Sequence, residues 1–105
     1  MPLTILNRCE MITGSYTGDG IDDRDIDVGV DLSTKTFIHI MIKGDVGGAS
    51  AEYVTGVAIG SSIRSYGDVI VNAIQDINST GFEIGTVGEV NTNTETYYYV
   101  VYYQE

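Results

Sequence analysis

Six aspartates lie within thirteen residues, between positions 19 and 31, with a single arginine among them. Calcium takes six to eight oxygen ligands, and Asp23, Asp25 and Asp27 supply the D-x-D-x-D half of a helix–loop–helix calcium loop. The other half fails, because the turn glycine falls one residue late, at Gly29, and the closing glutamate is absent. The alternative is a strand whose period-two alternation places the three aspartates on a solvated face. We favour the strand and predict no metal and no cofactor.

Residues that serve as nucleophiles, bases or zinc ligands are few. His39 is the single histidine and stands in an apolar run, without an orienting acid beside it, so we predict a packed or interface histidine. Cys9 is the single cysteine, so it cannot form a disulfide within the chain, and we expect a buried small hydrophobe. No phosphate-binding glycine loop is present, and nothing singles out two carboxylates for glycoside chemistry. We therefore predict no catalytic residue and a protein that is not an enzyme.

The C-terminal run from Tyr97 to Tyr103 contains five of the eight tyrosines. In a strand, Tyr98, Val100 and Tyr102 share one face and the other residues share the opposite face. If one face enters the core, the other leaves a large aromatic patch in water, which monomers rarely tolerate. Another subunit, a partner or a sugar could cover that patch, and so could a loop of the same chain. We take Tyr98 and Tyr102, with the three aspartates, as candidate contact residues.

The elements that must position these residues follow from length, composition and charge. A chain of 105 residues has room for one domain, which we place at residues 1–105. Val, Ile and Thr make up 35 of the residues, a composition typical of strands. The net charge of −10 argues against nucleic acid and against an anionic membrane surface as partners. No apolar run of 18 residues and no signal-peptide pattern is present, so we expect synthesis in the cytoplasm.

Strand-length runs alternate with turn clusters at the spacing of a sandwich or barrel. The expected strands are residues 4–12, 26–32, 37–42, 51–59, 69–77, 82–84 and 96–103. The third run is apolar on both parities, which predicts a central strand covered on both sides. The fifth run also fits helical spacing, and the helix stays open as an alternative. Together these runs predict an all-β fold, an antiparallel β-sandwich of about seven strands.

Several short motifs, in their order along the chain, resemble a small β-rich module of tailed-phage and prophage virion proteins. They are Gly14-Ser15-Tyr16-Thr17-Gly18-Asp19-Gly20, Asp23-Arg24-Asp25-Ile26, Phe37-Ile38-His39-Ile40-Met41-Ile42-Lys43, Gly81-Phe82-Glu83-Ile84-Gly85, Val90-Asn91 and Tyr97-Tyr98-Tyr99-Val100. The resemblance spans residues 14–100. This chain departs from the module after Gly29, where an aromatic residue and a proline are usual and neither is present.

The resemblance implies a non-enzymatic virion protein, and the module brings no agreed set of active-site residues. We expect an accessory or decoration protein that binds the capsid or tail surface, because the predicted strands nearly fill the chain and leave no docking segment. Other virion proteins would be its partners. Closed point-group symmetry favours a homo-oligomer, and the resemblance implies a trimer. The alternative is a receptor- or glycan-binding module of a tail fibre. In either case the protein would be located in the virion.

Overall fold

The computed structural model describes residues 9–44, 53–58, 61–64 and 69–104, and these residues form an all-β fold. The strands are β1 (Cys9–Thr17), β2 (Arg24–Asp27), β3 (Thr36–Gly44), β4 (Tyr53–Ala58), β5 (Ser61–Arg64), β6 (Val69–Val71), β7 (Ile74–Ile77), β8 (Gly81–Ile84) and β9 (Thr96–Gln104). A 3₁₀ turn, η1 (Leu32–Thr34), and a one-turn helix, α1 (Gly88–Asn91), complete the elements of the described residues.

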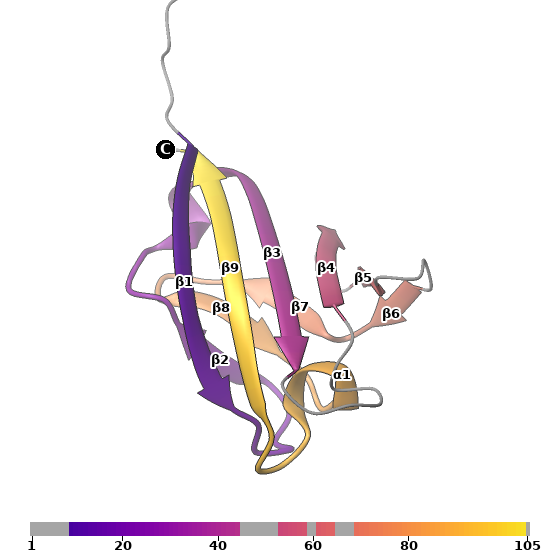
Figure 1. Ribbon diagram of the computed structural model, residues 1–105. Helices are drawn as coiled ribbons and strands as arrows, with labels where there is room; N and C mark the ends of the chain where they lie inside the picture. Colours follow the sequence, from indigo (N-terminus) through magenta and orange to yellow (C-terminus); the bar gives the residue numbers. More distant parts are fainter. Residues whose placement is uncertain (1–8, 45–52, 59–60, 65–68, 105) are drawn as a thin grey trace, which may run out of the picture.

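The strands form two antiparallel sheets (Figure 1). The larger sheet has the order β1-β9-β3-β4-β5-β6, and the smaller has the order β2-β8-β7. The all-β prediction is confirmed, but the seven-strand sandwich is wrong. Residues 69–77 form neither one continuous strand nor a helix. Strand β6 ends before Asn72, where φ is +61°, and the chain then passes from the larger sheet to β7 in the smaller sheet. β5 lies between the strands expected at residues 51–59 and 69–77, where no strand is expected.

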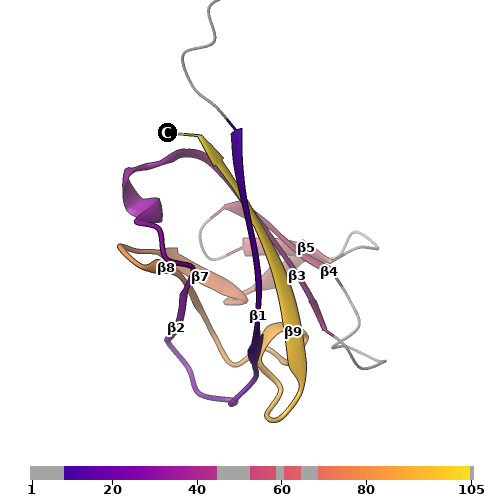
Figure 2. The ribbon, with the colours of Figure 1, turned by 60° about the vertical axis from the view of Figure 1, so that its left-hand side comes forward.

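The core lies between the smaller sheet and the β9–β3 part of the larger sheet (Figure 2). The rings of Phe82 on β8 and Tyr99 on β9 meet edge to face, with centroids 5.7 Å apart. Edge-to-face contact suits the quadrupoles of two aromatic rings. The remaining buried apolar residues of this core are Ile26, Leu32, Ile40, Ile42, Ala73, Ile74, Ile84, Val90, Tyr97, Val101 and Tyr103. Aromatic and β-branched residues thus fill most of the space between the layers.

The second strand ends five residues earlier than the alternation predicts, at Asp27. The Asp27 carboxylate accepts a hydrogen bond from the amide of Gly29, N···Oδ1 2.8 Å, and Gly29 has a φ of +80°. Four residues on, Asp31 caps η1 by accepting from the amide of Ser33 at 3.0 Å. Short aspartate side chains compete in this way with ladder hydrogen bonds. Two of the predicted strand's alternating aspartates therefore turn the chain instead of extending it.

The first strand extends further along the chain than expected. Residues 4–8 of the expected strand lie outside the described residues, and β1 continues past residue 12 to Thr17. Residues 13–15, which follow the end of the first expected strand, lie inside β1, and β1 pairs with β9 over nine consecutive residues without irregularity. The Tyr99 ring covers Gly14 and leaves no room for a side chain. A Cβ at this position would lie 2.3 Å from the Tyr99 hydroxyl oxygen. Cys9, predicted to be buried, is exposed, because it begins β1 at the rim of the sheet.

No helix among the described residues has the length and apolar character needed to cross a membrane.

Candidate functional site

Strand β9 separates its tyrosines into two sets, as predicted. Tyr97, Tyr99, Val101 and Tyr103 point into the core and are buried. The alternate side chains point to the outer face of the larger sheet, where Tyr98 is 50% exposed. An exposed tyrosine beside a buried one on the same strand is the consequence of the two-residue period of a β-strand.

The neighbours of these outward tyrosines come from the strands on either side. Tyr102 stands opposite Met11 on β1 and opposite His39 on β3, and Val100 stands opposite Met41 on β3. Met11 is 61% exposed. We call the outward set formed by Met11, Met41, Tyr98, Val100 and Tyr102 the tyrosine face. His39 borders it, half-buried, with its ring centroid 6.3 Å from that of Tyr102.

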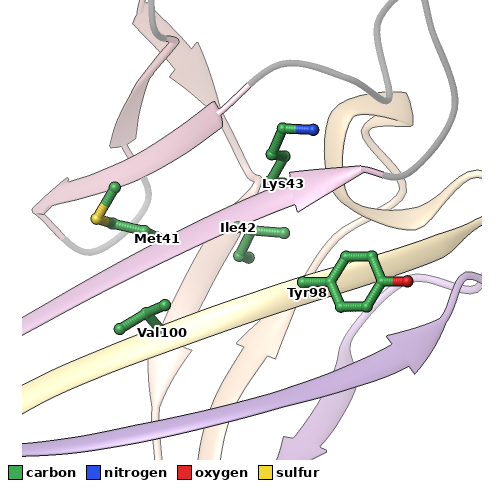
Figure 3. A pocket seen from close by; sticks show the side chains of 5 residues that line it. All are labelled: Met41, Ile42, Lys43, Tyr98 and Val100. Carbon is green, nitrogen blue, oxygen red and sulfur yellow. The ribbon is translucent and has the colours of Figure 1, made fainter.

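A shallow hollow of about 180 Å³ opens in the tyrosine face between β3 and β9 (Figure 3). Its lining comes from Met41, Ile42 and Lys43 on β3 and from Tyr98 and Val100 on β9. The surface that these side chains present to the hollow is almost entirely apolar. The prediction that β3 is covered on both sides is wrong, because Met41 and Lys43 are only half-buried on the outer face.

Two of the three candidate aspartates lie on the smaller sheet, and the third lies just before it. Asp25 and Asp27 are exposed on β2, as the strand interpretation predicts, whereas Asp23 is exposed just before the strand, with a φ of +54°. Asp25 stands opposite Glu83 on β8, which stands opposite Asp76 on β7. We call the set Asp25, Asp27, Asp76 and Glu83 the acidic face.

The charges of the acidic face act on one another. Partial burial raises the pKa of the Glu83 carboxyl, and the neighbouring Asp23, Asp25, Asp76 and Asp22 carboxylates raise that pKa further. Like charges disfavour ionisation in this way. Glu83 is therefore the carboxyl of this face that takes up a proton more readily than an isolated glutamate.

The aspartates of the acidic segment do not converge on one point. Asp25 accepts from Nδ2 of Asn78 at 2.8 Å, and Asp22 accepts from Nε2 of Gln75 at 3.0 Å. Asp19 forms an ion pair with Arg24, with 3.4 Å between Oδ2 and Nε. Within the described parts of the chain, no group of three or more His, Cys, Asp or Glu side chains is arranged to hold a metal ion. Each of these carboxylates has a different partner.

A buried amide that the sequence interpretation missed anchors this segment. Asn91, fully buried in α1, accepts from the amide of Asp19 at 2.9 Å. Its Nδ2 donates to the carbonyl oxygens of Ile21, at 2.9 Å, and Gly85, at 3.0 Å. The side chain thus joins the loop after β1 to the loop before α1. The sequence motifs that contain Asp19, Gly85 and Asn91 are therefore in contact, and Asn91 holds the backbone of the two loops in place.

Tyr16 makes a second connection between the same motifs. Its hydroxyl donates to the carbonyl of Val90 at 2.7 Å, and its ring stacks on Tyr97 with centroids 5.4 Å apart. Burial strongly raises the pKa of the Tyr16 hydroxyl, Tyr97 adds to that rise, and the Arg24 guanidinium opposes it. The hydroxyl therefore stays protonated and can donate its hydrogen bond at any physiological pH.

The tyrosine face and the acidic face lie on opposite sides of the molecule, because each is the outer surface of one of the two packed sheets. The structure therefore does not bring the two sets of candidate contact residues together. No protein-family model matches this chain, and neither does any curated protein or solved structure in the comparisons.

Proposed function

We propose that this chain is a non-enzymatic virion structural protein of a tailed phage, an accessory or decoration protein that binds the capsid or tail surface as a homo-oligomer. The observation that carries the proposal is the tyrosine face. Large apolar side chains gather there on a regular sheet surface, with Met11 at 61% and Tyr98 at 50% exposure. Contiguous exposed apolar patches mark interaction sites, and tyrosine and methionine are enriched in protein interfaces.

The hollow favours a protein partner over a sugar. A site that selects a sugar presents several polar groups that converge on its hydroxyls, around an aromatic platform. The hollow presents almost no polar surface. An apolar side chain of a partner protein would fill such a lining better. The receptor- or glycan-binding module is therefore the second candidate, supported by the exposed Tyr98 ring.

The position of the acidic face also supports an accessory role. A protein with contact surfaces on opposite sides can bind the particle with one and leave the other free. The acidic face would steer approach toward basic surfaces and away from acidic ones, because charge complementarity acts on the rate of encounter. We assign the contact with the particle to the tyrosine face, since apolar burial stabilises a complex more than exposed charges do.

Immunogold electron microscopy of phage particles induced from the parent host tests the location. Antibodies against this protein should label the capsid or the tail of purified particles. Unlabelled particles would contradict the proposal. Labelled tails, together with binding of the purified protein to a glycan array, would instead favour the second candidate.

The double variant Tyr98→Ser, Tyr102→Ser tests the surface. We expect it to fold, because both side chains lie on the outer face, and to lose co-sedimentation with particles that lack the native protein. Phe37→Ser is the matched control, since Phe37 is 80% exposed but lies outside the tyrosine face. Unchanged co-sedimentation of the double variant would exclude the tyrosine face as the contact.

A further inference from the structure

Strand β1 leaves one edge of the larger sheet open (Figure 1). It is nine residues long and pairs with β9 along its whole length, and within the described residues no strand pairs with its other side. Its sequence, CEMITGSYT, contains no proline, lysine or arginine. A long regular edge strand with unpaired backbone groups is a template for another strand unless a protective feature is present.

The other sheet edges among the described residues have such features. β6, at the far edge of the larger sheet, has three residues. β2 has four, of which Arg24, Asp25 and Asp27 are charged. β7 has four as well, and its pairing with β8 shifts register between Ile74 and Asp76. Short length, charge and irregular register all discourage edge pairing. Strand β1 therefore differs from every other edge of the described sheets.

We propose that β1 pairs antiparallel with β1 of a second copy of this chain, about a twofold axis at Thr13. Two requirements fix this register. A twofold axis through a residue pairs the inner-facing residues of one copy with the inner-facing residues of the other. An axis between two residues would instead pair inner-facing residues with outer-facing ones. Thr13 is the middle residue of β1, so this axis pairs all nine residues.

Charge complementarity favours the same register and the same partner. With the axis at Thr13, Glu10 stands opposite Tyr16 of the second copy. Arg24 lies at that end of the edge: its guanidinium carbon is 5.3 Å from the centroid of the Tyr16 ring, and its Nη1 donates to the Thr17 carbonyl. Symmetry therefore places a carboxylate near a guanidinium twice in the interface.

The neighbouring symmetric registers lose this contact. An axis at Ile12 moves Glu10 opposite Gly14 of the second copy, and an axis at Gly14 moves it beyond the end of β1. Both also leave residues of β1 unpaired. Opposite charges in register stabilise a strand pair, and like charges destabilise it.

This pairing makes the two larger sheets continuous and sets their tyrosine faces side by side. Two linked copies of one contact surface increase the effective affinity for a repetitive particle without any new contact. The inference deepens the proposed function, since it rests on the homo-oligomer that is part of it, and it replaces the trimer implied by the resemblance with a twofold pair. It does not depend on which particle is bound.

Cross-linking at the axis tests the register. Thr13→Cys in a Cys9→Ser background should form an intermolecular disulfide under mild oxidation. Opposed residues of antiparallel strands have Cα atoms about 4.5–5.5 Å apart, within the roughly 4.4–6.8 Å that a disulfide spans. Ser79→Cys in the same background is the matched control, because Ser79 is exposed in the turn before β8, and it should not cross-link. A wild-type oligomer whose Thr13→Cys variant does not cross-link would overturn the proposal.

Sedimentation velocity tests the strand pair itself. Thr13→Lys places two ammonium groups at the axis, and Glu10→Lys places one beside Arg24, so each should raise the dimer dissociation constant about tenfold or more. Thr13→Ser should leave the constant unchanged, and far-UV circular dichroism should show all three variants folded. A wild type that stays monomeric at its highest soluble concentration would overturn the pairing. Particle labelling would then still decide the proposed function separately.

Discussion

The Asn91 side chain is fully buried and forms hydrogen bonds with the backbone of Asp19, Ile21 and Gly85. Removing one partner of a buried hydrogen bond costs about 1–3 kcal/mol for each group left unsatisfied. Asn91→Ala should therefore lower the free energy of unfolding by about 3 kcal/mol or more, measured by urea denaturation. Asn91→Asp keeps the acceptor and loses the donor, so we expect a loss close to that of alanine.

Asn93→Ala is the control for this measurement. Asn93 is exposed two residues after α1, and exposed substitutions change stability by about 0.5 kcal/mol or less. Equal losses for Asn91→Ala and Asn93→Ala would show that the buried amide is not the connection between the two loops.

Glu83 makes the stability of the protein depend on pH in an unusual direction for a carboxyl. Its pKa is raised in the folded state, so the folded protein binds this proton more readily than the unfolded chain. The Glu83 contribution therefore becomes more favourable as pH falls from neutral through the folded pKa. Glu83→Gln should be more stable than the wild type at neutral pH, and this advantage should shrink in mildly acid solution.

Urea denaturation of dilute protein at a series of pH values checks this behaviour. Glu10→Gln, on the larger sheet, is the control and should follow the pH dependence of the wild type. A Glu83→Gln variant that is less stable than the wild type at neutral pH would contradict the like-charge repulsion on the acidic face.

At the scale of the elements, the loop after β1 is joined to the segment after α1 by direct backbone contact. The Gly18 amide donates to the Glu95 carbonyl at 2.8 Å, and a Cβ on Gly18 would lie 2.0 Å from the carbonyl oxygen of Thr92. The backbone cannot move aside as a flexible side chain could. Gly18→Ala should therefore lower the free energy of unfolding by roughly 3 kcal/mol, at the upper end of overpacking effects.

Gly29→Ala is the comparison for this prediction. Gly29 has a φ of +80° but has open space around the Cβ position, so its substitution brings only the strain of one left-handed residue, about 1 kcal/mol. Thermal unfolding of both variants should show a larger loss of stability for Gly18→Ala than for Gly29→Ala. If Gly29→Ala were the more damaging change, backbone conformation and not the contact with Thr92 would control this region.

The sequence predicts strands well where one period persists over many residues. The expected strands at 37–42 and 96–103 lie within β3 and β9. It predicts them poorly where one side chain redirects the backbone, as Asp27 does at the end of β2 and Asn72 does between β6 and β7. Such turns depend on local hydrogen bonds and on a positive φ, which leave no periodic pattern.

The candidate site likewise has a part that the sequence predicts and a part that it does not. The outward direction of Tyr98 and Tyr102 follows from the two-residue period, which is local information. Their neighbours Met11 and Met41 depend on strand order and register, which are set by pairing between distant segments. The role of Asn91 likewise depends on a loop some 70 residues earlier in the chain. Non-local pairing is the part of the structure that one sequence does not encode in any short pattern.

At the scale of the whole molecule, the charge of −10 opposes the compact state and the approach of a second copy. Salt screens these repulsions, with a Debye length of about 10 Å at 0.1 M. Adding sodium chloride to a low-salt buffer should therefore raise the melting temperature and favour the dimer, measured by calorimetry and sedimentation. Calcium chloride at matched ionic strength should give the same melting temperature, because the described carboxylates of residues 19–31 do not converge on one point. A further rise with calcium, reversed by a chelator, would contradict this assignment.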